Sequence, residues 1–192
     1  MKVLLIMEQD RDHMISEAYE LIRKAMKKEK IDLTVVDLTG KEIKGCVSCG
    51  KCVRHQGCMI QDELNTILPE LKNFDGLFVL SPVIFTSLSQ PVANYLERLF
   101  RCGAPDLSGK PAAGITAGRN RIPSEHWLKL TGYFAQANMP VATNQYQNEL
   151  IRSRDDINKE VVVNLTASLI HLMKNVSPEA SGKAVKTINF VR

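Results

Sequence analysis

The sequence of 192 residues predicts an α/β fold in which a doubly wound, five-stranded parallel sheet carries helices on both faces. Short, nearly continuous apolar runs alternate with longer segments whose apolar residues recur at helical spacing. Such runs are typical of strands that are buried on both faces. Because crossovers between parallel strands are right-handed, a doubly wound sheet is the simplest topology for this alternation. The expected strands cover 2–7, 32–38, 76–81, 111–116 and 139–143.

Five segments between and after these runs have helical patterns. In the first, Met14, Ala18 and Ala25 fall on one face, and the segment ends in lysines that suit a helix C-terminus. Pro69 is expected to kink the second helix. Pro91 lies near the start of the third, where a missing N–H is tolerated. The expected helices cover 11–30, 62–74, 89–100, 124–137 and 156–175.

Length and composition favour one domain, residues 1–176, followed by a weakly patterned tail, 177–192. The net charge of +4 comes from scattered residues with no basic stripe among aromatics, which argues against nucleic-acid binding. No apolar run approaches the roughly 20 residues needed to cross a bilayer, and the first run is too short for a signal peptide. We therefore expect a cytoplasmic protein without a membrane partner.

In doubly wound sheets the ligand crevice lies beyond the carboxyl ends of the strands. The loops expected at this edge are 8–13, 81–89 and 116–125. A cysteine-rich loop, 45–61, follows the second strand, so we expect it to open at the same edge. This shared edge would bring a redox cofactor and the cysteines together.

The cysteine-rich loop contains two overlapping C-x2-C units and a further cysteine six positions on. Gly45, Gly50 and Gly57 permit the tight turns that fold thiolates round one centre. The spacing favours a [4Fe–4S] cluster, since structural zinc sites usually use two separated pairs. Zinc and unmetallated thiols remain alternatives, and a C-x2-C disulfide relay is less favoured. The expected metal ligands are Cys46, Cys49, Cys52 and Cys58.

Two other residues near this motif have simpler interpretations. His55 is expected to be a solvent-facing loop residue rather than a ligand. Cys102 is expected to be a free, buried cysteine apart from the motif.

The stretches "GCVSCGKC", "SPVIF" and "GKPAAGITAGRN" resemble the flavodoxin-like NADPH-dependent FMN reductase superfamily, and within it the iron–sulfur flavoproteins. The resemblance covers roughly residues 45–175. It implies a sheet of strand order 2-1-3-4-5 that binds FMN beside a [4Fe–4S] cluster. One segment would wrap the flavin ring and a second would meet it from the other side, where backbone N–H groups tune its potential. The implied flavin contacts are Ser81, Pro82, Val83, Ile84, Phe85, Thr86, Ala117, Gly118, Arg119 and Asn120. For Phe85, packing in the core is the alternative interpretation.

The loop after the first strand departs from the family pattern. The family has a glycine- and hydroxyl-rich loop that holds the FMN phosphate, whereas this chain has "MEQDRDHMIS". Glu8, Asp10 and Asp12 would repel a phosphate by about 4 kcal/mol per pair at 4 Å in a surface-like dielectric. Arg11 is the candidate replacement contact, helped by His13 and Ser16. The stretch "RIPSEHW" also departs from the family, so we expect a remodelled pocket there.

The resulting hypothesis is a redox flavoprotein that carries electrons between FMN and a [4Fe–4S] cluster, or reduces a small acceptor with them. No side chain needs to act as a nucleophile. One alternative is a flavin-only reductase that takes hydride from NAD(P)H, and another is a flavin-less metal-binding or redox-sensing module. The expected partners are a small redox carrier protein or a small-molecule acceptor, and further copies of the chain in a homodimer or higher homo-oligomer.

Overall fold

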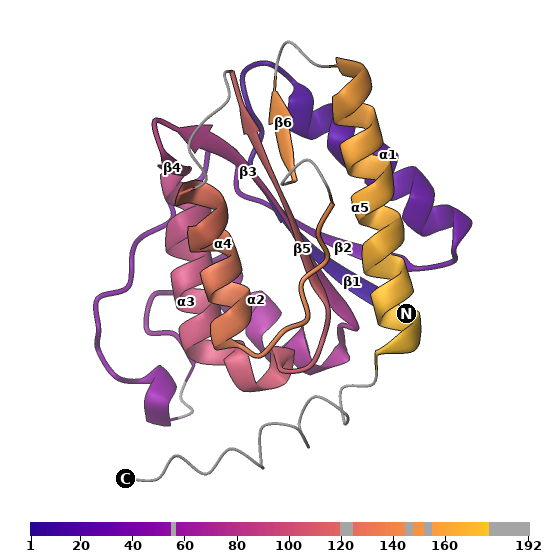
Figure 1. The fold of residues 1–192 in the computed structure, drawn as a ribbon. Coiled ribbons are helices and arrows are strands. Elements are labelled where there is room, and N and C mark those ends of the chain that lie inside the picture. Colours follow the sequence, from indigo (N-terminus) through magenta and orange to yellow (C-terminus); the bar gives the residue numbers. More distant parts are fainter. Residues whose placement is uncertain (55–56, 120–124, 145–147, 152–154, 177–192) are drawn as a thin grey trace, which may run out of the picture.

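The computed structural model describes residues 1–54, 57–119, 125–144, 148–151 and 155–176. Within these ranges a parallel sheet lies between two layers of helices (Figure 1). The tail expected at 177–192 lies outside the described residues. The strands are β1 (Lys2–Met7), β2 (Asp32–Asp37), β3 (Gly76–Ile84), β4 (Ser87–Leu88), β5 (Ala112–Gly118) and β6 (Glu149–Ile151).

The described strands pair in the order β2-β1-β3-β5-β6, and all of these pairs are parallel. This confirms the expected order of five parallel strands. In the register, Leu5 of β1 lies between Val35 of β2 and Phe78 of β3. The two-residue strand β4, which the sequence did not predict, turns back antiparallel on the end of β3.

The position predicted for the fifth strand is wrong. Segment 139–143 makes only an isolated bridge, between Val141 and Ala112, and β6 pairs with the carboxyl half of β5 instead. The physical reason is a pair of asparagines between the two segments. Asn148 is fully buried, accepts a hydrogen bond from the Asn144 N–H at 3.0 Å and donates one to the Ala142 carbonyl at 3.2 Å. These side chains take backbone groups that a continuous strand would use for its ladder.

Each helix covers one face of the sheet. Helices α1 and α5 pack on one side, and α2, α3 and α4 on the other (Figure 1). The expected helix at 62–74 breaks at Leu68 into a 3₁₀ segment that carries Pro69 in its first turn, in line with the predicted kink. The helical elements are α1 (Met14–Lys28), η1 (Cys52–Arg54), α2 (Glu63–Ile67), η2 (Leu68–Asn73), α3 (Gln90–Leu107), α4 (Glu125–Gln136) and α5 (Asp155–Asn175).

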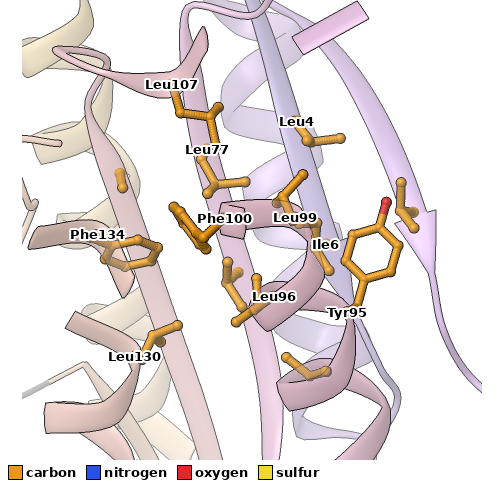
Figure 2. Close-up of a cluster of buried hydrophobic side chains, with 14 of the residues drawn as sticks. Leu4, Ile6, Leu77, Tyr95, Leu96, Leu99, Phe100, Leu107, Leu130 and Phe134 are labelled. Carbon is orange, nitrogen blue, oxygen red and sulfur yellow. The ribbon is translucent and has the colours of Figure 1, made fainter. Parts of the chain in front are cut away.

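Apolar side chains fill both interfaces between the sheet and the helices. Figure 2 shows the interface under α3 and α4, where Leu4 and Ile6 of β1 face Leu99 and Tyr95, and Phe134 closes the far end. Because the buried side of α3 is packed tightly against the sheet, the position of its other side is fixed as well. A loop that packs on that side is therefore held in a defined place. Among the described helices, none combines the length and the apolar character needed to cross a membrane.

Candidate functional site

A hollow of about 510 Å³ opens at the carboxyl edge of the sheet, and we call it the edge hollow. The loop after β1 and the carboxyl ends of β3 and β5 build it, as expected for a doubly wound sheet. Its walls combine apolar groups from β3 with charged groups from the first loop. The lining residues are Glu8, Gln9, Asp10, Arg11, Asp12, Met14, Pro82, Val83, Ile84, Ala117, Gly118 and Arg119.

Seven of the predicted flavin contacts line the edge hollow: Arg11, Pro82, Val83, Ile84, Ala117, Gly118 and Arg119. Ser81 does not line it. Its buried hydroxyl donates to the Pro82 carbonyl at 2.9 Å and accepts from the Ser89 N–H at 3.3 Å, so it holds the chain where β3 ends. Asn120 lies outside the described residues. Binding of a flavin by these residues stays a prediction.

Phe85 and Thr86 form the tip of the β3–β4 hairpin beside the edge hollow. The Phe85 side chain is 90% exposed, so the alternative that it packs in the core is wrong. Its backbone has φ = 61°, a left-handed conformation that costs a bulky residue free energy. An exposed aromatic ring held in a strained turn next to a hollow is typical of a ligand contact.

The loop after β1 is held by its own carboxylates. Asp10 accepts a hydrogen bond from the Ile15 N–H at 2.8 Å and another from the Asp12 N–H at 3.2 Å. Arg119 lies across the hollow with its Nε 3.1 Å from an Asp12 carboxylate oxygen. Ser16, which was expected to help hold a phosphate, donates to the His13 carbonyl at 2.7 Å instead.

The cysteine-rich loop surrounds a second hollow, of about 250 Å³, which we call the cysteine hollow. All four predicted metal ligands line it, Cys46, Cys49, Cys52 and Cys58, together with Cys102. Gly50 and Gly57 have φ = 72°, so the turns between the cysteines use conformations that favour glycine. His55 lies outside the described residues.

The expectation that Cys102 stands apart from the motif is wrong. This cysteine is free, but it is only half-buried and it lines the same hollow as Cys52 and Cys58. Burial, and after it the neighbouring Cys52 and Cys58 thiols, raise the pKa of the Cys102 thiol to about 12. The fifth thiol is therefore held protonated beside the other four at neutral pH.

Arg98 on α3 anchors the cysteine-rich loop. Its side chain is 1% exposed, and its Nε donates to the Cys58 sulfur at 3.3 Å. The other guanidinium nitrogens donate to both carboxylate oxygens of Asp62 and to the carbonyls of Lys44 and Ile60. Burial alone would lower the pKa of Arg98, but the bonds to Asp62 and Cys58 outweigh it and raise this pKa. A buried, permanent positive charge thus lies beside one of the predicted ligand sulfurs.

Arg98 was not among the residues expected from the sequence, although a signal for it existed. Tyr95, Arg98 and Cys102 recur at helical spacing, so Arg98 shares one side of the helix with a fully buried tyrosine. An arginine on such a stripe requires a buried acceptor. That acceptor is Asp62, 36 residues away in the chain, and the sequence does not reveal the pairing.

The cysteine hollow does not lie at the edge where it was expected. The cysteine-rich loop runs down α3 to η1, as Figure 1 shows: Asn94 holds the Ile43 carbonyl at 2.7 Å, Arg98 holds Cys58 one turn later, and Cys102 follows after another. At 1.5 Å per residue, Arg98 and Cys102 lie about 12 and 18 Å along the helix from its first residue, Gln90. In the part of the chain that the structure describes, the two hollows share no lining residue. The loop leaves the edge because its anchors lie on α3, not on the sheet.

The thiols of the cysteine hollow surround it without converging on one point. In the described ranges, no three His, Cys, Asp or Glu side chains come close enough together to hold a single metal ion. A zinc ion needs four ligands at about 2.0–2.3 Å from one centre. A four-iron cluster takes four thiolates that stand farther apart, because each binds a different iron. The donor set of four thiols round one hollow fits the cluster better than a single ion.

Comparison with known proteins assigns the chain to a family. The family model described as NADPH-dependent FMN reductase matches residues 1–148. The chain belongs to this family. The matched residues include the carboxyl edge of the sheet and the described residues that line both hollows. The match agrees with the family resemblance of the sequence motifs.

Curated relatives in the family include iron–sulfur flavoproteins. One from Methanocaldococcus jannaschii is 29% identical over 106 residues, which are 53% of this chain and 54% of that protein. Another from Archaeoglobus fulgidus is 26% identical over 113 residues, 56% of this chain and 58% of that protein. The chain thus spans about half the length of the curated relatives it matches.

Solved structures share the fold at low identity. The crystal structure of RosB with a bound riboflavin-5'-phosphate intermediate has a TM-score of 0.66 at 14% identity, covering 100% of this chain and 91% of that one. An archaeal flavodoxin has a TM-score of 0.63 at 13% identity, covering 91% of this chain and 100% of that one. These matches show a flavodoxin-like fold.

Proposed function

We propose that this chain is a redox flavoprotein in which the ring of an FMN-type flavin lodges in the edge hollow and the cysteine hollow holds a [4Fe–4S] cluster. The observation that carries the proposal is the presence of two separate hollows, each lined by the residues that one of these cofactors needs. A flavin supplies one- and two-electron chemistry, and a cluster supplies one-electron chemistry. The chain would exchange electrons between them and pass them to a redox carrier protein or a small acceptor.

The walls of the edge hollow suit a planar ring more than a phosphate tail. Pro82, Val83 and Ile84 offer an apolar wall, and Ala117, which pairs in register with Pro82, and Gly118 add small residues and backbone beside it. Phe85 stands at the rim with its ring free to cover a ligand. The loop that would hold the phosphate fits poorly, because Asp10 already bonds its backbone N–H groups. The residues that line the edge hollow therefore support binding of the flavin ring more than binding of the phosphate.

The cysteine hollow suits an anionic cluster. Four thiols line it, and Arg98 donates to one sulfur while the Ser48 N–H donates to the Cys46 sulfur at 3.4 Å. Hydrogen bonds and positive charge next to cluster sulfurs raise the reduction potential, since they favour the more negative, reduced state. Arg98 would thus hold the loop and make the cluster easier to reduce.

The separation of the two hollows along α3 bears on the route of the electrons. Transfer within one chain would cross the length of helix between the hairpin tip and Arg98. A second copy that sets its cysteine hollow near the first copy's edge hollow would shorten this route, so we retain the homodimer as part of the proposal. The exposed Ile84 and Phe85 at one hollow and Val47 and Val53 at the other are apolar groups available for such contacts.

An anaerobic visible spectrum of the freshly purified full-length chain, with iron and sulfide analysis, tests the proposal. We expect two resolved flavin bands, a broad shoulder from the cluster, and bleaching of both on reduction. Flavin bands without iron would overturn the cluster and favour the flavin-only reductase that uses NAD(P)H. Iron without any bound or added flavin would favour the metal-binding or redox-sensing module.

A further inference from the structure

The carboxylate of Asp10 occupies the N-terminus of α1. In doubly wound folds the first helix N-terminus after β1 is where a nucleotide phosphate binds, because its N–H groups are unpaired and its dipole favours an anion. Here the Ile15 N–H and the Asp12 N–H already donate to the two oxygens of Asp10. An anion that is part of the chain therefore takes the bonds and the position that a phosphate would use.

The side chains of the first helical turn offer a phosphate nothing in compensation. Met14 and Ile15 are buried and apolar, and the Ser16 hydroxyl donates to the His13 carbonyl. The Gln9 N–H in the preceding loop donates to the Thr39 hydroxyl at 2.9 Å. The Gln9, Asp12 and Ile15 N–H groups and the Ser16 hydroxyl are thus bonded within the protein itself.

The charges on the walls of the edge hollow also oppose an anion. Among the described residues, three carboxylates line it, from Glu8, Asp10 and Asp12, against the two guanidinium groups of Arg11 and Arg119. Arg119 is already paired with Asp12 at 3.1 Å. A dianionic phosphate would lie among like charges at short range.

Glu8 adds an observation that points to the kind of ligand. One of its carboxylate oxygens is buried and has no hydrogen-bond partner in the described part of the chain, although the residue lines the edge hollow. A buried oxygen without a partner costs free energy until a donor reaches it. A ligand hydroxyl can donate to this oxygen, whereas a phosphate oxygen repels it.

We propose that the edge hollow prefers a flavin that has a neutral hydroxylated tail, of the riboflavin class, over FMN, because Asp10 stands in for the phosphate. This inference rests on the proposed function, since it assumes that a flavin ring binds there. The ring would use the apolar wall formed by β3, and the hydroxylated tail would meet the carboxylates of the first loop.

The test is a pair of titrations on the full-length chain freed of flavin, following the quenching of flavin fluorescence at low ionic strength. We expect riboflavin to bind at least about tenfold more tightly than FMN. In Asp10→Ser and in Asp10→Asn, which removes the charge but keeps an oxygen for the Ile15 N–H, FMN should gain about tenfold while riboflavin changes less than about threefold. Asp32→Ser, which removes an exposed carboxylate at the opposite end of the sheet, is the matched control and should change neither affinity.

The outcomes separate the inference from the proposed function. Tighter binding of FMN than of riboflavin, with loss of that advantage in Arg11→Ala, would mean that Arg11 holds a phosphate, and would overturn the inference alone. An unchanged ratio of the two affinities in both Asp10 variants would overturn it as well. If neither flavin binds, the proposed function falls and the inference falls with it.

Discussion

Arg98 and Asp62 form a two-pronged ion pair that joins α3 to the start of α2, with the Arg98 Nη2 2.8 Å from one carboxylate oxygen. The arginine is 1% exposed and the aspartate 14%. The same guanidinium also bonds the Cys58 sulfur and two loop carbonyls. The shape of the cysteine hollow therefore depends on one buried charge.

Removing that charge should destabilise the protein strongly. Arg98→Met leaves the nearly buried Asp62 carboxylate without its counter-charge and the Lys44 carbonyl without its donor, so we expect the free energy of unfolding to fall by about 3 kcal/mol or more. Urea unfolding of the flavin-free chain measures this. Arg101→Met is the control, because Arg101 is exposed and pairs with Glu97 at 3.4 Å, and it should cost less than about 1 kcal/mol. Equal costs in the two variants would contradict the role given to Arg98.

The same pair should make stability depend on pH in the acid range. Burial raises the pKa of Asp62, but the hydrogen bonds from Arg98 and the Leu64 N–H and the charge of Arg98 lower it overall, below its ordinary value of 3.8. A lowered folded pKa means that the stabilisation is fully present above the ordinary value and is lost as the pH falls through the folded pKa. We expect Asp62→Asn to show a shallower loss of unfolding free energy below about pH 4 than the parent chain. Parallel acid limbs for the two proteins would refute this.

The five cysteines should differ in their effect on metal content. We expect Cys49→Ser to lose the iron and sulfide of the anaerobically purified protein and its cluster absorbance, since a four-iron cluster needs four thiolates. Cys102→Ser is the matched control, because it lines the same hollow from α3 but lies outside the motif, and it should keep its iron. Circular dichroism should show that both variants stay folded. Unaltered iron in Cys49→Ser, or its loss in Cys102→Ser, would mean that the ligand set is different.

Phe85 should matter for ligand binding and not for folding. Phe85→Gly relieves a left-handed backbone and removes no buried contact, so the unfolding free energy of the flavin-free chain should change by less than about 1 kcal/mol. Riboflavin should nevertheless bind about fivefold or more weakly, as fluorescence titration would measure. Phe85→Asn, which tolerates the same backbone conformation, should behave alike. A large loss of stability in either variant would assign Phe85 to the fold instead.

Two glycines should respond to alanine in opposite directions. A Cβ on Gly114 of β5 would lie 2.4 Å from Leu130 Cδ2 of α4, so Gly114→Ala should cost about 1–3 kcal/mol through overpacking. A Cβ on Gly132 in α4 meets nothing within 4 Å, and Gly132→Ala should stabilise the helix by up to about 1 kcal/mol. Thermal unfolding of the two variants checks both signs. Similar shifts in the melting temperature would contradict this packing of α4 on β5.

The sequence by itself determined the alternation of strands and helices, the doubly wound parallel sheet and the loops that meet at its carboxyl edge. Those features follow from local periodicity and from the handedness of crossovers, both of which are written in neighbouring residues. The cysteine spacing also brought four thiols round one hollow, because short loops with glycine turns leave them few other arrangements.

The tertiary structure decided where the cysteine hollow lies, what holds it and what fills the first loop. Arg98 finds Asp62 across 36 residues, and Asn148 replaces part of a strand ladder, and neither pairing has a local signature. Asp10 at the edge hollow is a similar case. Its charge was evident from the sequence, but the hydrogen bond that it accepts from the Ile15 N–H was not. Hydrogen bonds between distant residues depend on packing that brings them together, so only the folded chain reveals them.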